Sequence, residues 1–119
     1  MSAGDWKDLF KAACEGDLAL VRYHVEAGVS LNHAHPEFYS TPLVGAILAG
    51  QEAVALYMLD HGADPNLRSE FDNLTPLEAA RRGGLRQLEV RLLELGARDT
   101  HPWVQALRQW LPGSRQARP

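Results

Sequence analysis

Residues 75–80 read Thr-Pro-Leu-Glu-Ala-Ala, and the opening Thr-Pro-Leu also stands at residues 41–43, 34 positions earlier. The same spacing relates other positions along the chain, and each set holds identical or closely similar residue types. These sets are Gly16, Gly50 and Gly84; Gly28, Gly62 and Gly96; Leu9, Leu43 and Leu77; Ala12, Ala46 and Ala80; Leu20, Val54 and Leu88; and Val25, Leu59 and Leu93. A shared period of this kind indicates a repeat architecture with three units.

Each unit is expected to form two short helices. In the middle unit, Thr41 is followed by proline, and a threonine cap with proline in the first turn is typical of a helix start. The pattern predicts helices at about 42–49 and 52–61. Glycine ends each helix, at Gly50 and Gly62, because it adopts the left-handed conformation readily.

The outer units vary this pattern. The third unit repeats it from Thr75 to Gly96, whereas the first has no Thr-Pro, so we expect Asp5 to cap its first helix. After Asp99 the period is lost, and a new apolar stripe predicts a further helix at about 102–111. The stripe consists of Trp103, Ala106, Leu107, Trp110 and Leu111.

A terminal helix of this kind is expected to cover the core of the last repeat, which would otherwise face water. The alternative is that its two tryptophans form a patch for a partner protein. Residues 112–119 are Pro, Gly, Ser, Gln, Ala and Arg, a composition that predicts a disordered tail.

These motifs resemble the ankyrin-repeat family. The matching segments are Thr-Pro-Leu at 41–43 and 75–77, Gly-Ala-Asp-Pro-Asn at 62–66 and Gly-Val-Ser-Leu-Asn at 28–32. Tetratricopeptide repeats share the 34-residue period, but their Trp, Leu-Gly and Tyr positions are absent here. The resemblance implies an all-α ankyrin-repeat solenoid of three helix-turn-helix repeats with hairpin fingers. It implies one domain at 1–111, with repeats at about 5–35, 36–69 and 70–99 and a C-terminal capping helix.

The chain departs from the family pattern in three ways. The period is one residue longer than usual, so the fingers are expected to be slightly long. The histidine that follows Thr-Pro-Leu in the family is replaced by Phe10, Val44 and Glu78. The turn glycine of the finger is replaced by Tyr39 or Asn73, and since asparagine tolerates positive φ better than tyrosine does, the first finger is expected to turn elsewhere.

Composition limits the possible classes of protein. A chain of 119 residues has room for one domain, and no apolar run approaches the roughly 18 residues of a membrane span. The first ten residues carry Asp5 and Asp8 where a signal peptide has a basic cluster. The lone Cys14 is expected to be a small packed side chain in a reducing compartment. We therefore expect a cytoplasmic protein that does not bind membranes.

The sequence contains no pattern that predicts catalysis. It has no phosphate-binding glycine loop, no nucleophile-elbow motif and no paired metal-ligand spacing. His33 and His35 would need a third ligand, such as His61 or Asp64, to hold a metal. We expect no enzymatic activity, no cofactor and no metal.

Charge is separated along the chain. Residues 1–80 carry 4 basic and 12 acidic side chains, whereas residues 81–119 carry 8 basic and 3 acidic ones. No Lys or Arg stands between Arg22 and Arg68. A negative field repels nucleic-acid phosphates and favours a protein partner with a basic surface. The alternative is a solvated face that only aids solubility.

The resemblance implies contacts through the finger tips and the inner face of each first helix. The residues so implied are Trp6, Glu37, Phe38, Tyr39, Ser40, Leu48, Glu70, Phe71, Asp72, Leu74 and Arg82. Three of them are aromatic residues in polar loops, Phe38, Tyr39 and Phe71, and aromatic side chains often anchor interfaces. The alternative is that these rings brace the long fingers.

The expected function is therefore a protein–protein interaction module. The chain would act as a monomeric adaptor, inhibitor, scaffold or regulatory partner. The alternative is structural self-association through the cap helix or the fingers.

Overall fold

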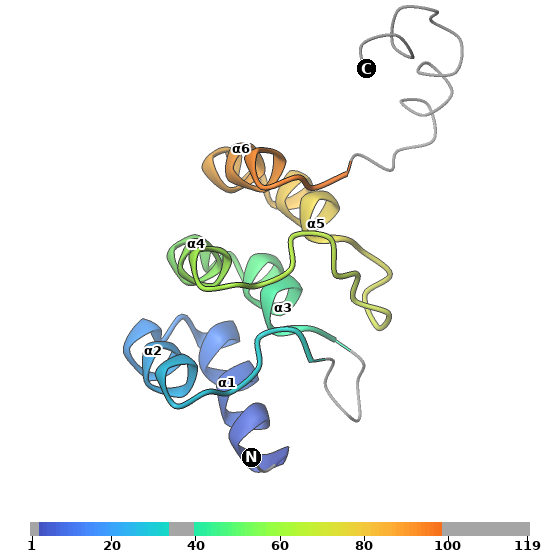
Figure 1. The fold of residues 1–119 in the computed structure, drawn as a ribbon. Helices are drawn as coiled ribbons and strands as arrows, with labels where there is room; N and C mark the ends of the chain where they lie inside the picture. Colours follow the sequence, from blue (N-terminus) through green and yellow to red (C-terminus); the bar gives the residue numbers. More distant parts are fainter. Residues whose placement is uncertain (1–2, 34–39, 99–119) are drawn as a thin grey trace, which may run out of the picture.

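The computed structural model describes residues 3–33 and 40–98, and this part of the chain contains six helices and no strand (Figure 1). The helices are α1 (Ala3–Glu15), α2 (Leu18–Glu26), α3 (Pro42–Leu48), α4 (Glu52–Asp60), α5 (Pro76–Gly83) and α6 (Arg86–Glu94). The predicted all-α architecture is confirmed for these residues. The predicted cap helix at 102–111 and the tail at 112–119 lie outside the described residues.

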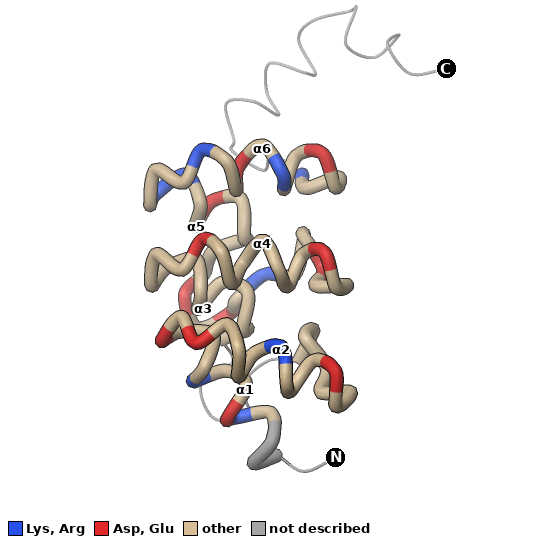
Figure 2. Tube along the Cα trace, turned by 90° about the vertical axis from the view of Figure 1, so that its left-hand side faces the viewer, with Lys and Arg blue, Asp and Glu red and all other residues tan. Residues whose placement is uncertain are grey.

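The six helices form three pairs that stack in the order of the sequence. The first helices of the pairs, α1, α3 and α5, pack against one another and form the inner row. The second helices, α2, α4 and α6, form the outer row (Figures 1 and 2). Each pair therefore contacts mainly its neighbours along the stack, as expected for a repeat array.

The predicted helix starts at Thr41 and Thr75 are confirmed. The Thr41 hydroxyl accepts a hydrogen bond from the Val44 N–H at 3.3 Å. At Thr75 the hydroxyl accepts from the Glu78 N–H at 3.2 Å, while the Glu78 carboxylate accepts from the Thr75 N–H at 3.0 Å. This reciprocal pair satisfies two otherwise open donors of the first turn. Glu78, which replaces the family histidine, therefore stabilises the start of α5.

The prediction that Asp5 caps the first helix is wrong. Helix α1 already includes Ala3, so Asp5 lies within it. No proline follows Asp5 to define a first turn, and helical hydrogen bonding therefore continues towards the start of the chain. The predicted ends of the middle helices were each one residue too long, since α3 ends at Leu48 and α4 at Asp60.

The core lies between the two rows and consists largely of the recurring leucine, valine and alanine positions. Leu9, Leu43 and Leu77 are buried in the inner row, and the recurring alanines allow its helices to approach closely. His24 stands where the later repeats have Met58 and Leu92. His24 is buried, and its Nε2 has no hydrogen-bond partner among the described residues.

Two asparagines join successive pairs at the ends of the outer row. The Asn32 side chain donates to the Gly62 carbonyl at 3.1 Å and accepts from the Asp64 N–H at 2.7 Å. One repeat later, Asn66 donates to Gly96 and accepts from the Arg98 N–H, at 3.1 and 2.8 Å. Each amide thus satisfies two backbone groups of the next repeat, which sets the register between pairs.

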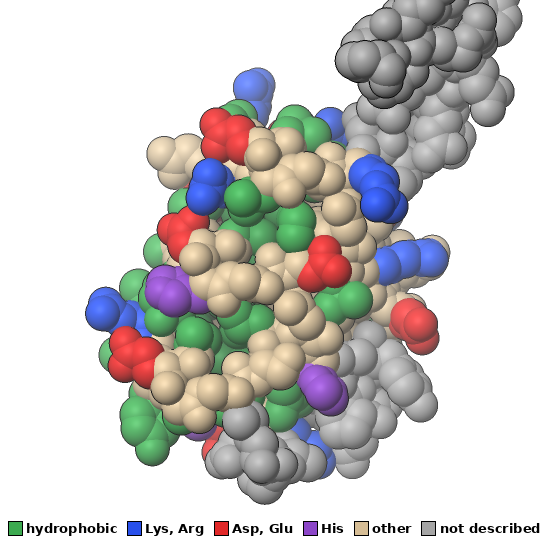
Figure 3. All heavy atoms as spheres, viewed as in Figure 1, with side chains coloured by type: hydrophobic (Ala, Val, Ile, Leu, Met, Phe, Trp, Pro, Cys, Tyr) green, Lys and Arg blue, Asp and Glu red, His purple; other side chains and the backbone are tan. Residues whose placement is uncertain are grey.

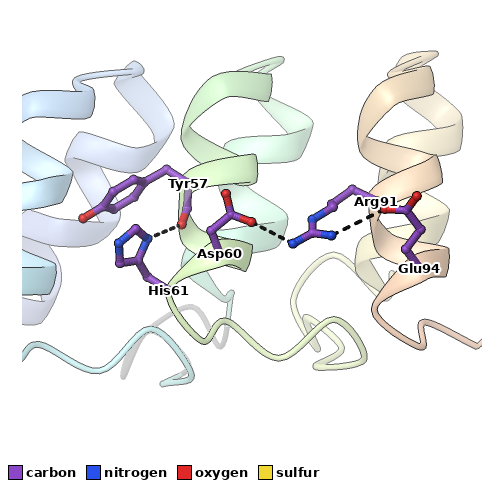
Figure 4. Close-up of polar contacts among 5 residues, drawn as sticks. All are labelled: Tyr57, Asp60, His61, Arg91 and Glu94. Carbon is purple, nitrogen blue, oxygen red and sulfur yellow. Dashed lines mark hydrogen bonds and ion pairs between the residues drawn. The ribbon is translucent and has the colours of Figure 1, made fainter.

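The outer row carries charges of both signs. Figure 4 shows Arg91 of α6 between Asp60 of α4, at 3.0 Å, and Glu94 of its own helix, at 3.4 Å. In the same figure the Nδ1 of His61 lies 2.9 Å from the Tyr57 carbonyl oxygen. Acidic and basic side chains alternate along this edge, on the left of Figure 3, so no single sign dominates it.

Candidate functional site

The second finger, residues 67–74, projects beside the inner row (Figure 1). Ser69 and Leu74 form an antiparallel bridge, with N–H to carbonyl distances of 2.9 and 3.3 Å. Asn73 has a φ of 58°, the left-handed turn conformation predicted for this position. Phe71, at the tip, leaves 67% of its surface exposed.

Asp72 ties this finger to the segment that precedes α3. Its Oδ2 accepts hydrogen bonds from the Ser40 hydroxyl at 2.9 Å and the Ser69 hydroxyl at 2.6 Å. The Asp72 N–H donates to the Ser69 hydroxyl at 3.3 Å. No group of the described residues donates to Oδ1. The carboxylate is therefore held in one orientation through Oδ2, and among the described residues its Oδ1 has no donor.

A hollow of about 490 Å³ lies between this finger and the inner row. Its lining residues come from α1, from α3 and the residues on either side of it, and from the second finger. They are Phe10, Cys14, Ser40, Gly45, Leu48, Ala49, Phe71 and Asp72. We call this feature the hollow. Its walls are mostly apolar, and Asp72 is the acidic group among these described lining residues.

Close packing of α1 on α3 shapes the hollow. A Cβ atom at Gly45 would lie 3.0 Å from the Cys14 Sγ and 3.1 Å from the Phe10 Cε1. The Phe10 ring stacks on Trp6 at a centroid distance of 5.5 Å. Glycine at position 45 therefore allows the two helices to approach.

The hollow raises the pKa of the Cys14 thiol above its ordinary value of 9.0. Burial is the largest cause, since it disfavours the thiolate. The carboxylates of Asp72 and Glu15 add to the effect through repulsion. Cys14 is therefore a protonated thiol at neutral pH. The negative charges of Asp72 and Glu15 lie close enough to disfavour its thiolate form.

The structure divides the predicted contact residues into three groups. Leu48, Glu70, Phe71 and Arg82 are exposed, and Asp72 is half-buried. Trp6, Ser40 and Leu74 are buried, with exposed fractions of 6, 5 and 7%. Of these three, Ser40 still lines the hollow, whereas Trp6 and Leu74 do not. Glu37, Phe38 and Tyr39 lie outside the described residues.

Sequence reasoning missed Phe10, Cys14 and Gly45. Cys14 could have been found, because it stands 34 residues before Leu48 and 68 before Arg82, at the same place in the repeat. Phe10 and Gly45 could not, since their role depends on how closely α1 and α3 pack.

The described residues contain no group of three side chains suited to hold a metal. His33 is exposed, and the ring of His61 stacks on Tyr57 at a centroid distance of 4.0 Å. Within residues 3–33 and 40–98, no helix has the length and apolar character needed to cross a membrane.

No family model matches the chain. The chain is 37% identical over 89 residues to the rat ARF GTPase-activating protein GIT2, a match that covers 75% of this chain and 12% of that protein. It is 34% identical over 88 residues to human ARF GTPase-activating protein GIT1, covering 74% of this chain and 11% of that protein. The chain therefore spans about an eighth of the length of these relatives.

A bacterial protein matches over a larger share of its own length. The Escherichia coli protein YahD, described as an ankyrin repeat protein, is 36% identical over 95 residues, or 71% of this chain and 45% of YahD. The fowlpox virus protein FPV222, also described as an ankyrin repeat protein, is 35% identical over 71 residues, or 60% of this chain and 9% of FPV222. The chain is thus similar, over part of its length, to ankyrin repeat proteins, as the motifs at 41–43 and 75–80 predict.

Proposed function

We propose that the chain is an ankyrin-repeat solenoid that binds another protein through the hollow and the surface around it. The observation that carries this proposal is the hollow itself, an open apolar space of about 490 Å³ beside an exposed aromatic ring. Aromatic side chains beside a concave space supply large contact areas. Similarity to ankyrin repeat proteins supports the same function.

The exposed residues would make the contacts. Leu48 and Phe71 form the apolar part of this surface, and Glu70 and Arg82 form its charged rim. Ser40 holds Asp72, Trp6 stacks on Phe10, and Leu74 pairs with Ser69 at the base of the finger. The predicted contacts of Glu37, Phe38 and Tyr39 would extend the surface along the first finger.

A partner with a basic surface fits the charge distribution. The middle pair, α3 and α4, carries Glu52 and Asp60 and no Lys or Arg, whereas basic positions gather on the uppermost pair (Figure 2). We propose that the chain acts as a cytoplasmic monomer, in the role of an adaptor, inhibitor or regulatory subunit.

The test is affinity purification from the source organism, identification of the partner by mass spectrometry, and titration of that partner. Replacing Leu48 and Phe71 together with alanine should weaken binding by about 2 kcal/mol or more. Gln87→Ala, on the exposed face of α6, is the matched control and should bind as the wild type does. Wild-type affinity in the double variant would exclude the hollow as the binding surface. Thermal melts of all variants separate lost contacts from lost folding.

Self-association is a second candidate function, and the ends of the stack favour it. Leu20 is 40% exposed and Leu93 is 44% exposed, whereas the equivalent residues inside the stack, Val54 and Leu59, are 2 and 5% exposed. A second copy could cover such an end. Light scattering over a concentration series tests this, because a constant monomer mass at micromolar concentration contradicts self-association.

A further inference from the structure

We propose that the hollow takes one arginine or lysine side chain from an extended segment of the partner protein, with the cationic end at Oδ1 of Asp72. This inference rests on the proposed function and deepens it, because it states the chemistry that the partner must present.

The position of the Asp72 carboxylate is the first argument. Two serine hydroxyls hold Oδ2, at 2.9 Å from Ser40 and 2.6 Å from Ser69, and these bonds fix the plane of the carboxylate. An ionised carboxylate can accept about four hydrogen bonds. Because Oδ1 receives no hydrogen bond from the described residues, the Asp72 carboxylate can still accept one from a donor on the partner protein. A charged donor makes the stronger bond.

The walls of the hollow are the second argument. Phe10, Leu48, Ala49 and Phe71 form an apolar lining that suits the alkyl stem of a long side chain. Lysine and arginine bury such stems against apolar surface while the charged end reaches a polar group. Aromatic rings beside the path of a cation add attraction.

Charge is the third argument. Asp72 and Glu15 both act on the Cys14 thiol inside the hollow, and no Lys or Arg is among the described residues that line it. Arg82 occupies the same repeat position as Cys14 and Leu48, but it is exposed on α5 and is not part of the lining. A purely apolar side chain would displace water from Asp72 without replacing its hydrogen bonds, which is unfavourable. A basic side chain avoids this loss.

The experiment uses pentapeptide probes with the full chain. The probes are Ac-Ala-Ala-X-Ala-Ala-NH₂, in which X is lysine, arginine, norleucine or glutamate. Norleucine is the matched control, since it keeps the stem of lysine and lacks the ammonium group. Backbone ¹H–¹⁵N NMR spectra follow each titration, and the amides of Gly45, Leu48 and Asp72 report on the hollow.

The lysine and arginine peptides should cause saturable shifts at these amides with dissociation constants in the millimolar range. They should bind at least about fivefold more tightly than the norleucine peptide, and added salt should reduce this preference. Asp72→Asn should abolish the preference, because asparagine keeps the shape and an acceptor but removes the charge. Glu26→Gln, the same charge change on the exposed face of α2, should leave it intact.

Three results would overturn the inference. These are norleucine binding as tightly as lysine, no peptide shifting the amides of the hollow, or the preference for lysine surviving in Asp72→Asn. The wild-type comparison of lysine with norleucine needs no variant, so it holds even if Asp72→Asn loosens the finger. The proposed function fails separately, when the identified partner binds the Leu48 and Phe71 double variant with wild-type affinity.

Discussion

Asp72 shows how one residue can serve both the fold and the site. Its Oδ2 joins the second finger to Ser40, and its Oδ1 faces no donor from the described residues. The sequence marked Asp72 as a contact residue because of its place in the finger. Its bracing role is visible only once residues 32 positions apart are brought together.

The raised pKa of Cys14 predicts that its thiol reacts slowly with alkylating reagents. Because burial and two carboxylates disfavour the thiolate, alkylation by iodoacetamide should be slower in the folded chain than in the urea-unfolded chain. The folded rate should still be rising above pH 9.0, the ordinary value for the thiol. Intact-mass measurement of labelling between about pH 7 and 10 checks this.

The same shift has a consequence for stability. A thiol whose pKa is raised on folding stabilises the fold in full when the pH is below the pKa of the unfolded chain. This stabilisation is lost as the pH rises through the pKa of the folded chain. Equal labelling rates in the folded and unfolded chains would contradict both expectations.

Gly45→Ala is predicted to destabilise the fold by about 1 kcal/mol, because the new methyl group crowds Cys14 and Phe10. Phe10 cannot easily turn away, since its ring stacks on the buried Trp6. The gain in helix propensity, at most about 1 kcal/mol, offsets part of the crowding. Chemical denaturation measures the difference.

Gly83→Ala is the matched control in α5. There a Cβ atom would meet only the Leu85 side chain, at 3.5 Å, an ordinary contact. The control should be neutral or slightly stabilising. If both variants unfold at the same denaturant concentration, close packing at Gly45 is not required.

At the scale of the elements, helices that lack their own caps are supported by neighbouring repeats. No side chain of Gln51 or Leu85 caps α4 or α6. The carboxylate of Glu52 in α4 instead accepts a hydrogen bond from the Leu88 N–H of α6 at 3.3 Å. The Gln51 side chain donates to the Cys14 carbonyl, also at 3.3 Å. Adjacent pairs therefore stabilise one another's helix ends.

Asn66→Ala tests the asparagine contacts between repeats. The change removes two hydrogen bonds to Gly96 and Arg98 and should lower the free energy of unfolding by about 1–2 kcal/mol. Gln87→Ala, exposed on α6, serves as the control and should cost little. A thermal melt of Asn66→Ala that coincides with the control would show that these bonds do not couple the repeats.

At the scale of the whole molecule, the described stack ends in apolar surface. Leu93 is 44% exposed, whereas Leu59, its equivalent one repeat earlier in α4, is 5% exposed, and α6 packs against α4. Val90 and Leu95 are exposed beside Leu93. The predicted helix at 102–111 carries an apolar stripe of the kind that would cover such a surface.

Trp110→Ala is therefore expected to lower stability by about 3 kcal/mol, because it removes a large side chain from the predicted cap. Gln109→Ala, off the apolar stripe, is the control. Thermal melting followed by circular dichroism compares the two. An unchanged melting temperature for Trp110→Ala would mean that the stripe faces solvent, where it would be available to a partner.

The sequence by itself determined the three-fold repeat, the starts of α3 and α5 and the apolar positions of the core. These features depend on local hydrogen bonds and on side chains that recur at a fixed spacing. Both can be recognised from the order of residues in the sequence. Thr75, for example, caps its helix through residues no more than three positions away.

Only the tertiary structure decided which residues form the hollow and which support it. Its lining spans residues 10–72, from two repeats and a finger, and its shape depends on the approach of α1 to α3 at Gly45. Trp6, Ser40 and Leu74 are buried, and of these three predicted contact residues only Ser40 lines the hollow. The physical reason is that the exposure of a side chain depends on how closely neighbouring helices and loops approach it. A repeat pattern gives the position of a residue within its unit but does not give these distances.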